Sequence, residues 1–228
     1  MRRIFLLLLF SLNSLNFFAQ TEETKPKNWI VKWNATAAVD VFSFPTVQFA
    51  VERKLNNYFS VQAEYGIQLY GFPKSDTVSV KNYGHRVIIE GRFYIFNYLK
   101  KDKSKTRKSD GLYTGLQLSY RKNSYNFTQE YYLNETDSDI QTDVIGVKKE
   151  VYAINVCFGY QIPFHNFILE PYVYLGYFNR NIENFDREYD ESAGHVPVDD
   201  IHYFGSDLTE ESDSYGNVSF GLRLGYKF

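Results

Sequence analysis

Apolar and polar residues alternate with a period of two along most of the chain after residue 28. Between Trp29 and Val41 every odd position is apolar, whereas the even positions include Lys32 and Asp40. This period is typical of a β-strand with one apolar and one polar face. Eight segments show it, at about residues 29–42, 46–55, 58–71, 83–96, 111–125, 148–162, 167–180 and 215–228.

The length of these segments separates two kinds of β protein. Most span about 10 to 15 residues, whereas strands of soluble proteins most often have about 5 to 6. A tilted strand needs about 9 to 11 residues to cross a membrane. The pattern therefore predicts an all-β fold, an antiparallel up-and-down transmembrane β-barrel of about eight strands over residues 29–228.

The connections give a partly independent argument, because a barrel with both termini on one side alternates short inner turns with longer outer loops. The short turns at 56–57 and 163–166 fall at inner positions. Long connections fall at outer positions, at 72–82, 126–147 and 181–214. Two connections do not fit, since 43–45 is short at an outer position and 97–110 is long at an inner one.

The N-terminus has the features of a secretory signal peptide. Arg2 and Arg3 precede a short Leu-rich stretch, and Ala19 supplies a small residue for cleavage. The sequence predicts a signal peptide at 1–20, a short N-terminal segment at 21–28, and a mature protein in the cell outer membrane. Cys157 is the only cysteine, so no lipid-carrying cysteine follows the apolar stretch and no intrachain disulfide forms.

Composition agrees with a barrel and excludes other classes. No later stretch of 18 apolar residues exists, which excludes a helical membrane protein. The mean hydropathy of −0.39 does not exclude a barrel, because lumen residues are polar. The 20 Tyr and 20 Phe suit aromatic girdles at two membrane interfaces. A net charge of −2 gives no reason to expect nucleic acid as a partner.

The chain ends in an aromatic strand. Phe228, Tyr226 and Leu224 lie on one face of the last alternating segment. Such a strand is similar to the signal by which the outer-membrane barrel assembly machinery recognises its clients. We therefore expect two partners, the assembly machinery during insertion and outer-membrane lipid afterwards.

Several stretches resemble an uncharacterised family of small outer-membrane β-barrels from Bacteroidota, of the type called domain of unknown function 3575. They lie at residues 32–34, 44–46, 52–54, 86–96, 111–120, 170–172 and 221–228. The resemblance implies a fold and a location. It transfers no catalytic residue, because none is established for the family.

The polar faces of the strands predict a charged lumen. Its expected members are Lys32, Glu64, Arg86, Glu90, Arg92, Glu170 and Arg223, with Arg86, Glu90, Arg92 and Glu170 at the centre. Side chains just fill the interior of an eight-stranded barrel, so these groups should pair and plug it. We therefore expect a structural or surface-interaction protein. The alternatives are a narrow channel or small-ligand binder and, third, a lipid-modifying enzyme.

The remaining polar residues give no defined site. The segment 183–213 holds eleven acids and one basic residue, Arg187, but their spacing matches no calcium loop, so we expect a solvated, mobile loop. The basic run 100–108 is a candidate contact for a cell-wall or periplasmic partner. No serine and acid accompany the histidines His85, His165, His195 and His202 at useful spacing. We therefore assign no catalytic, metal or cofactor residue and expect no enzyme.

Overall fold

The computed structural model of the protein describes residues 28–39, 45–68, 83–99, 111–198 and 210–228. Strands dominate: β1 (Trp29–Asn34), β2 (Thr46–Lys54), β3 (Phe59–Gln68), β4 (Tyr83–Tyr94), β5 (Gly111–Tyr132), β6 (Ile140–Phe164), β7 (Phe167–Phe185), β8 (Val196–Pro197) and β9 (Glu211–Lys227). Three helices are short: η1 (Thr36–Val39), α2 (Ile95–Leu99) and η3 (Glu191–Ala193). None of the described helices has the length and apolar character needed to cross a membrane.

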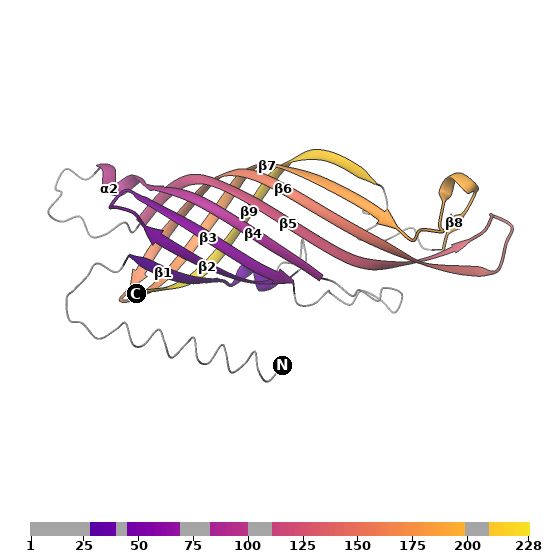
Figure 1. Ribbon diagram of the computed structural model, residues 1–228, viewed down its shortest axis with the longest axis horizontal. Coiled ribbons are helices and arrows are strands. Elements are labelled where there is room, and N and C mark those ends of the chain that lie inside the picture. Colours follow the sequence, from indigo (N-terminus) through magenta and orange to yellow (C-terminus); the bar gives the residue numbers. More distant parts are fainter. Residues whose placement is uncertain (1–27, 40–44, 69–82, 100–110, 199–209) are drawn as a thin grey trace, which may run out of the picture.

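Eight of the strands close into a ring (Figure 1). Each long strand pairs antiparallel with the next one in the chain, and β9 pairs with both β7 and β1. The two-residue strand β8 lies outside the ring and pairs with the end of β5. The expected all-β, antiparallel up-and-down barrel of eight strands is confirmed. The expected signal peptide and nearly all of the segment 21–28 lie outside the described residues.

The two ends of the barrel differ. One, here called the turn end, carries short turns at 55–58 and 165–166 and both chain ends of the barrel. The Asn56 side chain accepts the backbone N–H groups of Tyr58 and Phe59 at 2.7 and 2.9 Å, which stabilises the first turn. The second turn places His165 at a φ of 58°. Both short turns lie where the sequence predicts them. The opposite end is called the loop end.

Burial along the strands is the reverse of that in a water-soluble protein. In β3 the side chains of Phe59, Tyr65 and Ile67 are exposed on the outer wall. Between them Gln62 and Glu64 point inward and are buried. Soluble proteins bury apolar side chains and expose charged ones. The face assignment from the sequence is therefore confirmed, and the core of this barrel is polar.

The first strand is shorter than the alternation predicts. The sequence pattern continues to residue 42, but β1 ends at Asn34 and η1 follows. The Asn34 Oδ1 accepts the backbone N–H of Ala37 at 3.3 Å and the hydroxyl of Thr36 at 3.0 Å. Asparagine side chains compete in this way with a strand ladder, and the alanines that follow are weak strand formers.

At the loop end the strands are longer than expected. The connection predicted at 126–147 is mostly strand, because β5 and β6 continue as a hairpin to a turn at 133–139. Residues 124–148 and 181–198 form what we call the extension, which projects beyond the barrel (Figure 1). Buried apolar residues hold it together, namely Tyr125, Tyr131, Ile145, Val147, Ile182 and Tyr189.

The acidic segment is folded where it belongs to the extension. Tyr189 is only 2% exposed, and the Asp143 carboxylate accepts the backbone N–H groups of Glu188 and Tyr189 at 2.7 and 2.8 Å. Residues 183–198 are therefore folded onto the extension, while their acidic side chains are exposed to solvent as the sequence predicts. The number of acidic residues alone does not predict this fold, because it leaves out the apolar contact that the buried Tyr189 makes. Residues 199–209 lie outside the described part.

Candidate functional site: the charged lumen

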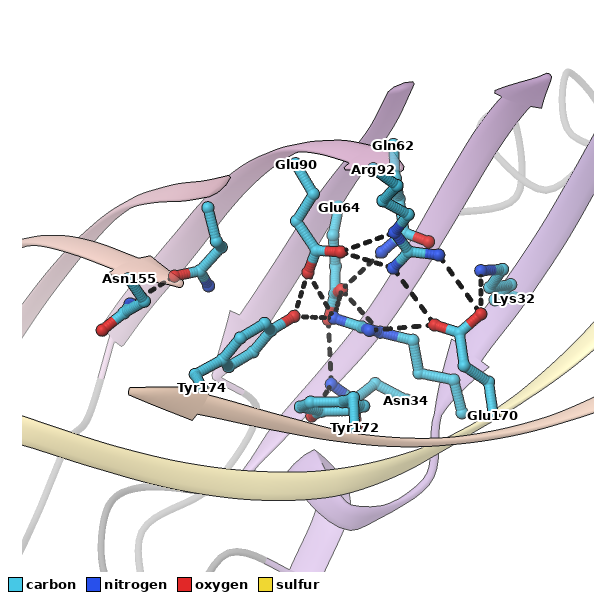
Figure 2. Close-up of polar contacts among 12 residues, drawn as sticks. Lys32, Asn34, Gln62, Glu64, Glu90, Arg92, Asn155, Glu170, Tyr172 and Tyr174 are labelled. Carbon is cyan, nitrogen blue, oxygen red and sulfur yellow. Dashed lines mark hydrogen bonds and ion pairs between the residues drawn. The ribbon is translucent and has the colours of Figure 1, made fainter. Parts of the chain in front are cut away.

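Seven ionisable side chains meet inside the barrel, and none of them is exposed to solvent. They come from six different strands and comprise three cations and four carboxylates: Lys32, Arg92, Arg223, Glu52, Glu64, Glu90 and Glu170. Figure 2 shows Glu64, Glu90, Arg92 and Glu170 pointing toward one another across the lumen. We call this set the lumen network.

Arg223 of β9 connects three carboxylates. Its Nη2 lies 2.8 Å from Glu64 and 3.0 Å from Glu90, and its Nη1 lies 3.1 Å from Glu170. The guanidinium also stacks over the ring of Tyr172, 3.9 Å from its centroid. Planar arginine forks suit such multiple, charge-assisted contacts. One side chain thereby ties β9 to β3, β4 and β7.

Arg92 of β4 makes a second junction nearer the turn end. Its Nε donates to Glu90 at 2.8 Å, and its Nη1 and Nη2 lie 3.1 Å from Glu52 and Glu170, respectively. The ring of Tyr113 lies beneath it, with 4.4 Å between the guanidinium carbon and the ring centroid. Glu90 and Glu170 therefore each contact both arginines, and the network is continuous.

Lysine side chains complete the charge balance at the turn end. The Lys32 Nζ lies 2.6 Å from Glu52 and also contacts Glu170. Lys54 is buried nearby, 5.5 Å from the ring centroid of Tyr94. With Lys54 this turn-side part of the lumen has four positive charges for the four carboxylates. Buried charges are tolerated when they are paired and hydrogen-bonded in this way.

Neutral side chains satisfy the remaining carboxylate oxygens. The Tyr113 hydroxyl donates to Glu170 at 3.0 Å. The Gln161 amide donates to Glu52 at 2.8 Å and to Glu170 at 2.7 Å. Tyr174 donates to Glu90. These bonds reduce the cost of holding the carboxylates away from water.

The inward-facing tyrosines are not among the lumen residues that the sequence predicts. Tyr94, whose hydroxyl donates to Glu52 at 2.5 Å, was not assigned to the lumen. It shares the inward face of β4 with Glu90 and Arg92. The alternation of side chains along the strand therefore predicts its position in the lumen. The composition suggests aromatic girdles for the tyrosines. Some of them, such as Tyr94, instead point into the lumen.

The structure brings six of the seven expected lumen residues together and separates one. The six are Lys32, Glu64, Glu90, Arg92, Glu170 and Arg223. Arg86, expected at the centre, is instead half-buried on the wall of a cavity toward the loop end. It precedes Glu90 by four residues, about 13 Å along a strand, which is too far for a contact. Glu52, which the alternation also places on the polar face, lies at the centre of the network in place of Arg86.

The outer wall carries aromatic residues toward both ends. At the turn end Phe59 packs against Phe93 and Phe167 against Tyr226, with ring centroids 5.2 Å apart in both pairs. Leu224, Tyr226 and Phe228 of the expected assembly signal are exposed on this wall.

Toward the loop end, Tyr120 and Tyr152 pack at 4.9 Å between ring centroids. Directly beyond them the outward face becomes charged. Lys122 pairs with Glu150 at 2.8 Å, and Lys148 pairs with Glu183 at 2.7 Å. The hydrogen bond from Lys148 holds the pKa of Glu183 below its usual value.

The histidine and acidic residues of the extension serve its local structure. His195 stacks on Tyr131 at 4.7 Å, and its Nδ1 accepts the backbone N–H of Asp190 at 3.1 Å. Hydrogen bonds from the Ser192 hydroxyl and backbone lower the pKa of Asp190. Within the described ranges no three potential metal ligands gather. His202 and the basic run 100–108 lie outside these ranges.

Comparisons with known proteins give a likeness in structure only. No family model and no curated protein matches the sequence. Among solved structures the chain is similar to a major outer membrane protein from Thermus thermophilus, with a TM-score of 0.38 and 12% sequence identity. The match covers 88% of this chain and 99% of that protein.

Proposed function

We propose that the protein is a small outer-membrane β-barrel with a plugged polar lumen and a structural or surface-interaction role. One observation carries the proposal, which is the reversed burial of the strands. Apolar side chains cover the outer wall of β3, while Gln62 and Glu64 are buried inside. An apolar wall of this extent is stable in hydrocarbon and unfavourable in water.

The height of the apolar wall fits a membrane. On β7 the outward residues from Phe167 to Tyr177 span eleven residues between the two aromatic zones. Tilted strands need about 9 to 11 residues to cross the hydrocarbon. The ion pair of Lys148 with Glu183 lies beyond Tyr177 on the loop side, where we place the aqueous exterior. The turn end then faces the periplasm.

The interior argues for a barrel that does not conduct ions. The charged side chains of the lumen network have no exposed surface and bond one another across the lumen. An ion would have to separate these pairs to pass, which costs several kcal/mol for each buried charge left alone (about 3–5). The network therefore supports a structural plug.

The extension supports the surface role. It is a folded projection with its own apolar cluster. Its outward side chains include the ion pair of Lys148 with Glu183 beside exposed Val144 and Phe185. In this proposal it stands above the outer membrane, where it is accessible to partners in the medium or on other cells. Rigid projections lower the ordering cost of binding.

The proposal includes the route to the membrane. Residues 1–20 act as a cleaved signal peptide, and the outward face of Phe228, Tyr226 and Leu224 acts as the assembly signal. Kinship with the Bacteroidota barrels of unknown function is part of the same proposal and rests on the shared strand motifs.

Electrophoresis of isolated outer membranes in SDS tests the membrane barrel. We expect the unheated mature protein to migrate faster than the heated one, because closed barrels resist the detergent until boiled. Recovery of the protein in the soluble periplasm, with identical mobility before and after heating, would overturn the proposal.

Planar bilayer recordings test the plug. We expect no steady current from the purified barrel, whereas sustained, ion-selective channels would favour the alternative of a narrow channel. The matched variant is Arg223→Ser, which removes the central cation and should introduce current if the network is what blocks the lumen.

A further inference from the structure

An arginine lies on the outer wall of the barrel near the turn end. Arg53 of β2 is exposed there, and its guanidinium carbon lies 5.2 Å from the ring centroid of Trp29 on β1. No ion pair to Arg53 forms within the part of the chain that the structure describes. The acidic side chains of the described turn end are those of Glu52 and Glu170, and both are buried in the lumen. The charge of Arg53 is therefore not balanced from within these residues.

The outward cations at the loop end have a different environment. Lys122 and Lys148 lie beyond the aromatic residues of that end, and each forms an ion pair with a glutamate. Arg53 instead lies beside Trp29, among the aromatic residues of the turn end, where we place the periplasmic interface of the membrane. A cation at this height is positioned to pair with negative lipid headgroups.

A hollow in the apolar wall lies beside Arg53. Arg53 pairs with Val61 of β3, and Val61 pairs with Gly91 of β4, so the three follow one another across the wall. Because neighbouring strands are about 4.8 Å apart, Gly91 lies about 10 Å from Arg53. A Cβ atom at Gly91 would meet no atom within 4 Å. The groove at this position has a volume of about 590 Å³, and its outward lining is largely apolar: Leu55, Phe59, Val61, Phe93, Leu116 and Val156.

The groove lies deeper in the wall than the arginine. Arg53 is the last residue but one of β2, directly before the turn at 55–58. Gly91 is three residues from the turn end of β4, and Val156 lies farther still along β6. A cation at the interface is therefore followed by an apolar hollow toward the middle of the wall. A phospholipid presents its phosphate and its acyl chains in the same order.

We propose that this part of the wall binds an anionic phospholipid of the periplasmic leaflet, with its phosphate at the Arg53 guanidinium and an acyl chain in the groove beside Gly91. Guanidinium groups form charge-assisted hydrogen bonds with phosphate, and the contact with Trp29 holds this one at headgroup height. The inference rests on the proposed membrane placement and gives outer-membrane lipid a defined site. The site selects a lipid and does not stabilise the barrel, because another lipid replaces one that leaves.

The two tryptophans of the chain, Trp29 and Trp33, provide the test, since both are exposed on the outer wall of β1. The full mature protein with Trp33→Phe keeps Trp29 as its reporter. It is placed in vesicles of phosphatidylglycerol and phosphatidylcholine, one of which carries bromine on the part of the acyl chain next to the glycerol. Bromine quenches nearby tryptophan fluorescence, so quenching against lipid composition gives the relative affinity of the two lipids. We expect a preference of about fivefold for phosphatidylglycerol at Trp29.

The matched control is Trp29→Phe, which leaves Trp33 as the reporter. Trp33 lies four residues farther from the turn end and pairs with Phe49, away from Arg53. We expect the two lipids to quench it about equally. An equal preference for phosphatidylglycerol at both tryptophans would show a general attraction of anionic lipid to the barrel and would overturn the site.

Variants of the Trp29 reporter protein locate the lipid. Arg53→Gln should reduce the preference to about one, and Gly91→Phe, which fills the groove, should reduce it at least by half. Val173→Phe adds the same ring to the outer wall of β7, outside the groove, and should leave the preference unchanged. The basic run 100–108 is present in every variant, so a preference that persists in Arg53→Gln contradicts the proposal. A preference that persists in Gly91→Phe removes the groove from it.

The heat-dependent mobility of the same preparations separates the two proposals and shows that each variant is folded. A barrel that inserts and shifts on heating, but has no lipid preference at Trp29, overturns the lipid site alone. A protein that does not associate with the vesicles overturns the membrane barrel and, with it, this site.

Discussion

The barrel and its extension are built from the same strands but follow opposite rules of burial. Within the barrel, β6 exposes Val156 and buries Asn155. Farther along the same strand, in the extension, Ile145 and Val147 are completely buried, while outward Lys148 pairs with Glu183. The two rules meet near Tyr152, within a few residues on a continuous strand.

The reversal indicates that the solvent around the strand differs between the barrel and the extension, whereas the backbone pairing is the same in both. A β-ladder satisfies its backbone groups in lipid as well as in water, so only the side chains have to respond. In lipid the apolar face lies outward and the polar groups must pair inside. In water the apolar side chains gather inside. The position of the reversal therefore marks the outer boundary of the membrane in our proposal.

Removal of a central cation should have the largest effect on this contrast. Arg223→Met leaves Glu64, Glu90 and Glu170 without their shared partner and should lower the free energy of unfolding by about 3–5 kcal/mol. Urea titration in lipid vesicles, followed by the folded band in unheated gels, measures this change. The control Arg53→Met removes an arginine from the outer wall and should change little. A loss below about 1 kcal/mol for Arg223→Met would mean that the network contributes little to stability.

A charge on the outer wall should be costly only within the barrel. Val156→Arg places a cation on the middle of the apolar wall and should cost about 2–4 kcal/mol in the same titration. Thr142→Arg changes an exposed residue on the same face of β6, within the extension, and should cost close to nothing. Equal costs at the two positions would contradict a change from lipid to water between them.

Strand parity in the sequence was enough to predict most of the barrel. The eight segments, both short turns and six of seven lumen residues follow from alternation, because a period of two assigns every side chain to a face. Parity does not give the height of a residue along the barrel, which depends on the stagger between strands. For that reason the alternation alone predicts Arg86 at the centre of the network, whereas its pairing with Arg121 places it beside the cavity.

The extension could not be predicted in the same way. In the extension the inward-facing residues of the strands are apolar, whereas in the barrel they are polar. A pattern that assigns apolar residues to the outer wall therefore does not predict strands there. The early end of β1 could not be predicted either. Ala35, Ala37 and Val39 continue the alternation although the backbone forms η1 there. Alternation records the face of a side chain, but not whether a neighbouring strand is present to pair.

The apolar cluster of the extension should be separable from the barrel. Tyr189→Ala removes a buried ring from this cluster and should reduce the local opening free energy by about 1.5–3 kcal/mol. Amide exchange across residues 141–147 and 186–198 should accelerate, while the urea midpoint of the barrel remains unchanged. Leu133→Ala alters an exposed residue in the turn of the extension and serves as the control. A matching loss in the barrel would show that the two regions fold as one unit.

The smallest expected effect is a pH dependence confined to the extension. The hydrogen bond from Lys148 lowers the pKa of Glu183. Their ion pair therefore contributes its full stability above the ordinary carboxyl pKa, and this stability is lost as the pH falls through the lowered value. Amide protection on β6 and β7 near this pair should therefore decrease below about pH 4. Glu183→Gln should flatten that decrease, whereas Glu135→Gln, in the exposed turn at 133–139, should leave it unchanged. Since the pair lies in water, high salt should weaken the same signal, and a response that ignores salt would contradict a location beyond the membrane boundary.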